Sequence, residues 1–168
     1  MKKAMINYIT SPKFDEFYTP DYAIKPLLKY IPKGITVWEC CDFGKSEITR
    51  LLKEYGCKVI STGKDENFLN YIPELEFDMI ITNPPYSLKD EFIAKCYEWN
   101  KPFALLLPIT ALGGKFRGNL FYKYGIQLMI FDKRIEFCKN KNGNWFNTSW
   151  FCYNILPEPL IFEKLEKE

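Results

Sequence analysis

Apolar and polar positions along the chain fall into segments that predict strands and helices in turn. Residues 35–39 form an apolar run typical of a buried strand, and residues 45–55 carry apolar side chains at helical spacing. Gly56 then favours a helix end, and a second apolar run follows at residues 57–61. A strand, a helix and a strand within so few residues predict a βαβ unit, in which the two strands run parallel.

The middle of the chain continues this alternation. Apolar runs predict strands at residues 77–82, 103–107 and 126–131. Between them, helical patterns predict helices over residues 87–99, with Ser87 as the cap, and over residues 116–124. The elements therefore alternate as they do in α/β proteins.

The N-terminal part is less regular. Residues 1–16 are polar and aromatic without a period, which indicates an arm or loop. A short helix is predicted at residues 22–30, because Thr19 offers a cap and Pro20 suits the first helical position.

The C-terminal part predicts a hairpin. The turn-rich stretch Lys139–Asn144 lies between the apolar segments 135–137 and 149–156, which read as two strands of a hairpin-like insertion over residues 133–148. The tail over residues 157–168 is polar and weakly helical.

These elements predict one α/β domain spanning residues 1–168. We expect a three-layer, Rossmann-like sheet that is mostly parallel and has an antiparallel strand at its end. Residues 61–77 are too few for a full crossover helix and a further strand. The sheet should therefore lack one edge strand or keep only a remnant of it.

Composition narrows the class of protein. The chain has 168 residues, of which 47% are hydrophobic and 17% aromatic, enough for one domain with a substantial core. Its net charge of +2 is not that of a protein that binds DNA through bulk charge, although a local basic patch is compatible with it. The sequence has no apolar signal-peptide core and no span-length apolar stretch, so we expect a cytoplasmic protein without a membrane partner.

Cysteine and histidine usage excludes further chemistry. The six cysteines contain no Cys-x-x-Cys pair, and the chain has no histidine. Histidine is the commonest metal ligand and the usual general base of hydrolases. We therefore expect reduced thiols, no metal, and a reaction that needs no imidazole.

The tetrad Asn83-Pro84-Pro85-Tyr86 directly follows the strand predicted at residues 77–82. Ligands bind at strand ends in open α/β sheets, and prolines leave carbonyls that can only accept hydrogen bonds. The Asn83 side-chain oxygen and the Pro84 carbonyl could hold the two hydrogens of an exocyclic amine, while Tyr86 stacks on a base taken out of its helix. These groups suit the methylation of an amine nitrogen.

The alternative is that the tetrad is only a turn that ends a strand. A shuffled chain of this composition would contain Asn-Pro-Pro followed by Tyr or Phe on the order of once in a hundred tries or fewer. The motif is therefore fairly specific.

Together with three other segments, the tetrad resembles the motifs of class I S-adenosylmethionine-dependent adenine-N6 DNA methyltransferases, in particular small phage-type orphan enzymes. Asp15–Pro20 is similar to the family's Phe-x-Thr-Pro element, and Val37–Gly44 takes the place of its first cofactor loop. Asn83–Tyr86 matches its catalytic tetrad, and Asn144–Trp150 resembles the late aromatic element that helps to hold the flipped base. The four segments stand in the family's order and cover nearly the whole chain.

The resemblance implies S-adenosylmethionine as the cofactor. The residues that it places at the cofactor are Tyr18, Thr19, Pro20, Glu39, Asp42, Gly44, Asn67, Phe68 and Asn83. The family's Asp-Pro-x-x-Gly-x-Gly loop is here Glu-Cys-Cys-Asp-Phe-Gly-Lys, which keeps one glycine for a close backbone approach. Glu39 and Asp42 are either contacts of the cofactor ammonium or ordinary loop carboxylates.

The resemblance also implies a nucleic-acid substrate, with DNA preferred over RNA. No segment fits a target-recognition domain, so candidate contacts come from the domain itself: Tyr86, Lys115, Arg117 and Phe146, with Lys133, Arg134 and Trp145 as secondary candidates. The cations could equally be solvated surface charges, and the aromatics could be core residues.

Two other functions are compatible with the sequence. The atypical cofactor loop would suit a noncatalytic binding or decoy module, and the tetrad could also serve RNA or a protein glutamine amide as the substrate. We expect a monomer or a weak homodimer.

Overall fold

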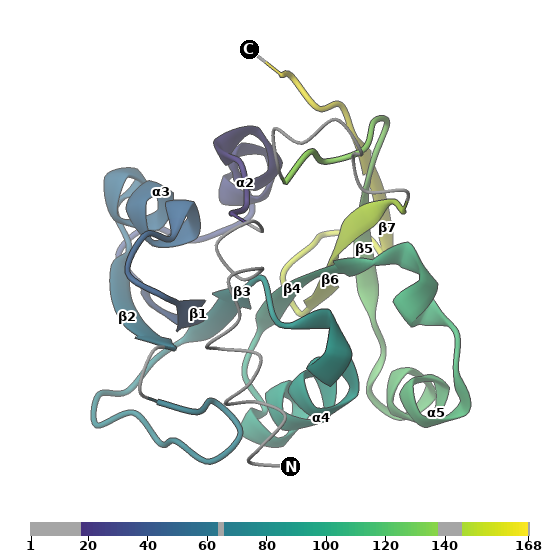
Figure 1. Ribbon diagram of the computed structural model, residues 1–168, viewed down its shortest axis with the longest axis horizontal. Coiled ribbons are helices and arrows are strands. Elements are labelled where there is room, and N and C mark those ends of the chain that lie inside the picture. Colours follow the sequence, from purple (N-terminus) through teal and green to yellow (C-terminus); the bar gives the residue numbers. More distant parts are fainter. Residues whose placement is uncertain (1–17, 64–65, 138–145, 168) are drawn as a thin grey trace.

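The computed structural model describes residues 18–63, 66–137 and 146–167, which form a seven-stranded sheet in the order β2-β1-β3-β4-β6-β5-β7 (Figure 1). The strands are β1 (Thr36–Asp42), β2 (Lys58–Gly63), β3 (Met79–Thr82), β4 (Phe103–Pro108), β5 (Gln127–Phe131), β6 (Thr148–Tyr153) and β7 (Leu160–Glu163). β6 is antiparallel to β4 and β5, and the other pairs are parallel. The predicted mostly parallel α/β sheet is confirmed, with its antiparallel strand inside the sheet rather than at its end.

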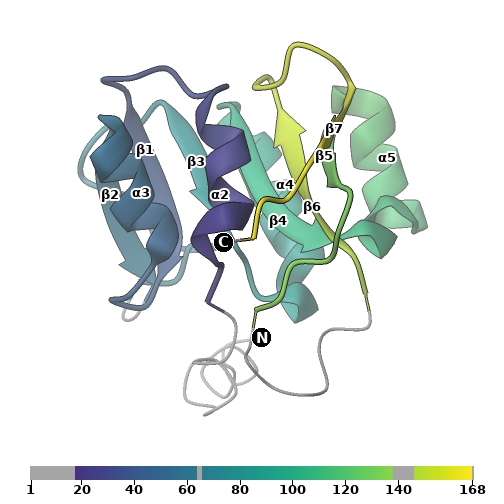
Figure 2. The same ribbon diagram turned by 90° about the horizontal axis from the view of Figure 1, so that it is seen from above.

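Helices cover both faces of the sheet and complete three layers (Figures 1 and 2). One face carries α2 (Asp21–Leu28) and α3 (Glu47–Tyr55), and the other carries α4 (Lys89–Trp99) and α5 (Lys115–Tyr124). Two short 3₁₀ helices, η2 (Tyr86–Leu88) and η3 (Ile109–Leu112), precede α4 and α5. In the described residues β2 has no strand beyond it, as the short spacing before β3 predicted.

Two apolar cores lie on the two faces of the sheet, because successive side chains of a strand point to opposite sides. In β6, Trp150 belongs to the core under α2 and α3, and Phe151 to the core under α4. The Trp150 indole Nε1 donates to the Ala23 carbonyl of α2 at 2.8 Å, so this helix is attached to the sheet by a buried hydrogen bond as well as by packing.

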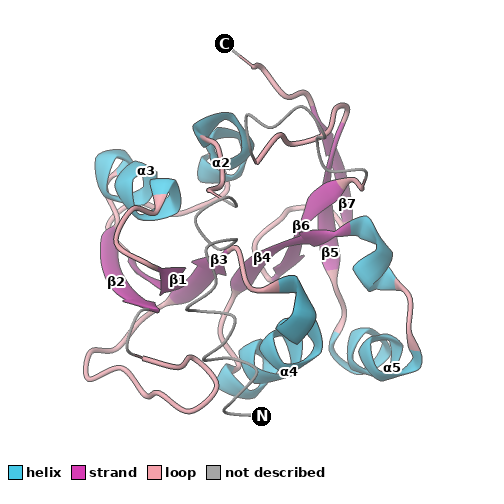
Figure 3. Cartoon of the chain, viewed as in Figure 1, coloured by secondary structure: helices cyan, strands magenta, loops and turns pink. Residues whose placement is uncertain are grey.

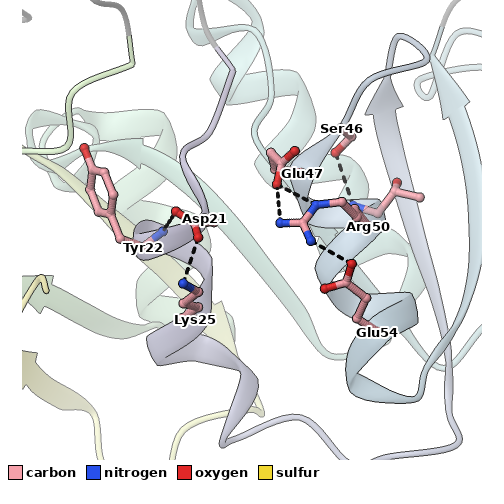
Figure 4. A network of polar contacts seen from close by, with 8 residues as sticks. Asp21, Tyr22, Lys25, Ser46, Glu47, Arg50 and Glu54 are labelled. Carbon is pink, nitrogen blue, oxygen red and sulfur yellow. Dashed lines mark hydrogen bonds and ion pairs between the residues drawn. The ribbon is translucent and has the colours of Figure 1, made fainter. Parts of the chain in front are cut away.

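The sequence explains where α3 begins and ends. Ser46 is its N-cap, with Oγ accepting from the Thr49 amide at 3.3 Å, and Gly56 ends it with a φ of 110°. Along the exposed surface, Arg50 pairs with Glu47 and Glu54, each at 2.7 Å (Figure 4). The predicted helix end at Gly56 is confirmed.

Two predicted caps are wrong. Ser87 lies inside η2, and α4 begins after Leu88 without a side-chain cap. Pro20 is the N-cap of α2, also without a side-chain cap, because the Thr19 hydroxyl is bonded to Asn83 instead. At Thr19 a tertiary contact therefore takes the hydroxyl that was predicted to cap the helix.

The C-terminal prediction also needs correction. Residues 135–137 form no strand, and β6 pairs with β4 and β5 instead of a hairpin partner. The predicted turn Lys139–Asn144 and the arm 1–16 lie outside the described residues. The tail contains strand β7, not a helix, because its backbone pairs with the edge of β5 and its Glu163 carboxylate binds Lys29, the C-cap residue of α2, at 2.5 Å.

Among the described residues, none of the helices combines the length and the apolar character that crossing a membrane requires.

Candidate active site

The predicted site residues follow β1 and β3, which are adjacent and parallel, so their carboxyl ends lie at the same edge of the sheet. The chain leaves β1 for one side of the sheet and β3 for the other, which makes this edge the topological switch point where α/β proteins bind ligands. Figure 3 shows the loop that leads from β3 into α4. This loop contains the tetrad.

Asn83 is connected to the N-terminal segment. Its Nδ2 donates to the Thr19 Oγ1 at 3.1 Å, and Thr19 is buried. The contact sets the plane of the carboxamide and directs Oδ1 away from Thr19. Two segments that sequence analysis placed at the cofactor and at the reacting amine are therefore in contact.

The rest of the tetrad is rigid. Pro84 and Pro85 are buried, and the Pro85 carbonyl accepts from the Leu88 amide at 2.9 Å in the turn of η2. The Tyr86 ring meets the Phe146 ring edge to face, with centroids 5.9 Å apart. The structure thus brings together the two aromatic side chains that were predicted at the substrate.

Glu39 connects the two strands. It is 1% exposed, and its Oε1 accepts from Thr82 Oγ1 of β3 at 2.5 Å and from the Cys41 amide at 2.9 Å. Its Oε2 accepts from Ser46 Oγ at 3.2 Å. Burial raises the pKa of Glu39 to about 7, and the nearby Asp42 charge adds to the effect, against these hydrogen bonds.

Asp42 closes the loop between β1 and α3. Its Oδ1 accepts from the amides of Gly44 at 2.7 Å and Ser46 at 3.2 Å. Its Oδ2 accepts from the hydroxyls of Thr49 at 2.6 Å and Ser61 at 2.9 Å. Burial alone would raise the pKa of Asp42, but these four hydrogen bonds outweigh it and lower that pKa below its usual value.

Two glycines shape the same loop. Gly44 has a φ of 98°, and a Cβ there would meet nothing within 4 Å, so the loop opens into free space. Gly63 of β2 has a φ of 145°, and a Cβ there would stand 3.0 Å from the Asp42 amide nitrogen. Close approach of the two strands therefore requires glycine at position 63.

Asn67 and Phe68 have different surroundings. The Asn67 Oδ1 accepts from the Leu69 amide at 3.0 Å, and its side chain is partly exposed. Phe68 is 1% exposed and stacks on Phe92 with centroids 4.8 Å apart. This placement favours a packing role for Phe68 over the predicted contact with the cofactor.

The predicted substrate cations are also placed differently. The Arg117 guanidinium donates to the carbonyls of Ala111 at 2.7 Å and Gly113, and pairs with Asp90 at 2.5 Å. Lys115 is exposed. The arginine therefore joins α5 to α4, whereas the lysine faces solvent.

The remaining candidates are placed as follows. Lys133 donates to the Leu165 carbonyl at 3.3 Å, and Arg134 is exposed. Tyr18, predicted at the cofactor, is 37% exposed, and Trp145 lies outside the described residues.

Sequence analysis missed two threonines. Thr82 ends the apolar run of β3 and bonds Glu39, as described above. Thr148 begins β6 opposite Pro108, is 2% exposed, and its Oγ1 has no hydrogen-bond partner within the described ranges. A threonine at a strand end has no pattern that distinguishes this role from ordinary strand propensity.

Comparison with known proteins identifies the fold. No family model matches the chain, and no curated protein matches it. Among solved structures, the 23S rRNA methyltransferase ErmE superposes with a TM-score of 0.51 at 14% identity, covering 90% of this chain and 72% of ErmE. A protein described as a class I S-adenosylmethionine-dependent methyltransferase, from Listeria monocytogenes, superposes with a TM-score of 0.53 at 10% identity, covering 99% and 71%.

The fold is therefore that of class I S-adenosylmethionine-dependent methyltransferases.

In the part of the chain that the structure describes, no three acidic or cysteine side chains form a group that could hold a metal ion.

Proposed function

We propose that this chain transfers the methyl group of S-adenosylmethionine to the N6 amine of adenine in nucleic acid, with DNA as the first candidate. The observation that carries the proposal is the tetrad Asn83–Tyr86 at the switch point of a methyltransferase fold, with the Asn83 amide held by Thr19. RNA is the second candidate polymer, since ErmE, which shares the fold, is a 23S rRNA methyltransferase.

The loop after β1 fits the cofactor in two respects. It opens into free space at Gly44, and the Oε2 of Glu39 accepts only one hydrogen bond from the described residues. Both oxygens of Asp42 already accept two, which fills a carboxylate's usual acceptor sites. We therefore expect Glu39, and not Asp42, to hold the cofactor's ammonium group.

Other contacts come from neighbouring segments. Thr19 bonds Asn83 and is flanked in sequence by Tyr18 and Pro20, and Asn67 offers an amide from the loop after β2. Bound among these residues, S-adenosylmethionine would supply an electrophilic methyl group. Aligning it with the amine is the main task of the protein, because positioning of reactants can account for roughly 7 to 11 kcal/mol of barrier reduction.

The tetrad would prepare the amine. The Asn83 Oδ1 and the Pro84 carbonyl accept its two hydrogens, so that the nitrogen lone pair leaves conjugation with the ring and becomes available for attack. Tyr86 would stack on one face of the extruded base, and Phe146 supports the Tyr86 ring edge to face. The tetrad has no carboxylate, imidazole or amine to act as a base, and the proton lost from the product nitrogen passes to solvent.

The test is transfer of labelled methyl groups from S-adenosylmethionine to DNA, RNA and protein by the purified chain. Asn83→Ala should reduce transfer at least a hundredfold, on the order of the loss of a key transition-state contact, with the fold intact by circular dichroism. Asn100→Gly is the matched control, because it removes an exposed carboxamide at the opposite edge of the sheet, in a left-handed conformation that glycine accepts. Wild-type activity of Asn83→Ala would refute the proposal.

A noncatalytic binding module is the second candidate function. The loop that favours it is the one closed by Asp42, whose internal bonds occupy the Gly44 amide that a cofactor could otherwise use. Calorimetric titration with S-adenosylmethionine separates the two functions. Binding would support the enzyme, and no heat at millimolar cofactor would support the module.

A further inference from the structure

The outward face of α5 combines aromatic and basic side chains. We define it as Lys115, Phe116, Asn119, Tyr122 and Lys123, which share one side of the helix because they are three or four positions apart. Phe116 is 52% exposed and Tyr122 is 96% exposed, and the other three are exposed as well. Rings with so little protein contact contribute little to the stability of the fold.

The charges in the stretch of sequence that contains this face are all of one sign. Between Glu98 and Asp132 the chain has no acidic residue, and it carries the cations Lys101, Lys115, Arg117 and Lys123. The Arg117 guanidinium is neutralised by Asp90. Lys115 and Lys123 remain on the outward face, at the two ends of the helix, next to the exposed rings.

The outward face is also fixed relative to the tetrad. α5 follows β4 through η3, so Lys115 and Phe116 lie toward the edge where β3 ends in Asn83. Arg117 of α5 bonds Asp90 in the first turn of α4, the helix that begins directly after the tetrad. At a rise of 1.5 Å per residue, the 10 residues of α5 extend about 15 Å. Figure 2 shows the helix running along the sheet from that edge.

We infer that the outward face of α5 binds single-stranded nucleic acid on one side of the target adenine. Lysines attract phosphates, and exposed rings stack on unpaired bases, which a duplex keeps enclosed. This inference rests on the proposed function, since it names the form in which the substrate reaches the tetrad. A single strand also needs no separate domain to extrude the base.

The experiment is a fluorescence anisotropy titration, without cofactor, of three labelled probes: a DNA strand of about 16 nucleotides, an RNA strand of the same sequence, and the DNA duplex. At least one single strand should bind roughly tenfold more tightly than the duplex. Tyr122→Ser should weaken that binding roughly fivefold or more, and Tyr122→Phe should preserve it, because the ring is what stacks.

Lysine variants supply the electrostatic control. Lys123→Gln should lower the slope of log affinity against log salt by about 0.7, whereas Lys53→Gln, an exposed lysine of α3 on the opposite face, should leave it unchanged. A preference for either the DNA or the RNA strand supports the inference and names the polymer.

Two results would overturn the inference: tighter binding of the duplex, or unchanged strand affinity in both Tyr122→Ser and Lys123→Gln. Neither result would contradict the proposed methyl transfer to adenine, because transfer by wild type and by Asn83→Ala is measured separately.

Discussion

At the scale of single residues, the buried carboxyl group of Glu39 gives the fold a pH dependence. Its pKa rises from an ordinary 4.5 to about 7 in the folded protein, mainly through burial. As the pH rises from 4.5 to 7 the unfolded chain releases this proton and the folded protein retains it, so the free energy of unfolding falls and then levels off. At about 1.4 kcal/mol per pKa unit, the change is on the order of 3 kcal/mol.

Glu39→Gln should remove this dependence. A glutamine Oε1 can still accept from Thr82 and Cys41, and the side chain has no proton to lose. Urea unfolding should find the variant about 3 kcal/mol more stable than wild type at pH 8 and similar to it at pH 4. Glu76→Gln, at an exposed position before β3, is the control that should shift neither value. An equal difference at both pH values would contradict the assignment.

The sequence identified the residues of the tetrad, but it did not distinguish the roles of the two acids Glu39 and Asp42 at the end of β1. Asn83 and Tyr86 stood out because their motif is rare. The structure places beside them Thr19 and Phe146, which were predicted separately at the cofactor and at the substrate. Glu39 and Asp42 both follow a strand, and no sequence pattern distinguishes an acid that binds a ligand from one that binds its own backbone. The proposal that Glu39 holds the cofactor's ammonium group therefore rests on the hydrogen bonds of the two acids and not on the sequence.

At the scale of elements, replacing the N-cap glycine of α5 and replacing its internal glycine with alanine should change the stability of the fold in opposite directions. Gly114 has a φ of 109°, and a Cβ there would stand 2.7 Å from the Arg117 Nη2, so Gly114→Ala should lower the free energy of unfolding by about 1 to 3 kcal/mol. Gly118 lies within the helix with open space around it, so Gly118→Ala should raise that energy by about 0.5 to 1 kcal/mol. Urea unfolding of both variants is the measurement, and a stabilising Gly114→Ala would be the contrary result.

Elements were predictable where local sequence determines them. The helix at Glu47–Tyr55 has a serine cap, apolar spacing and a terminal glycine, and it was predicted to within two residues. Strand β7 has no such local signal. It forms because its backbone pairs with the edge of β5 and its Glu163 pairs with Lys29, the C-cap residue of α2. Both partners are distant in sequence.

At the scale of the whole molecule, Trp150 links the sheet to the site through α2. Trp150→Phe removes the bond to Ala23 and leaves a small cavity, so it should cost about 2 to 3 kcal/mol of unfolding free energy. Since Ala23 lies in the first turn after Thr19, methyl transfer should also slow. Trp99→Phe is the control, because the Trp99 Nε1 has no hydrogen-bond partner in the described part of the chain, so this variant loses no hydrogen bond and should cost less. Equal losses in the two variants would contradict this role.

The overall plan of the molecule followed from the order of elements. Parallel βαβ units and a short spacing before β3 were enough to predict the layers and a sheet that lacks one edge strand. The place of β6 between β4 and β5 could not be predicted, because its six residues match β4 in apolar character and the pairing depends on contacts across the chain.

The four bonds to Asp42 have a consequence for ligand kinetics. They order the loop during folding, so the entropy of arranging Gly44 and Ser46 is lost before any ligand arrives. A molecule entering this edge would meet a preorganised rim. The free energy of its binding would therefore not include the cost of ordering this loop.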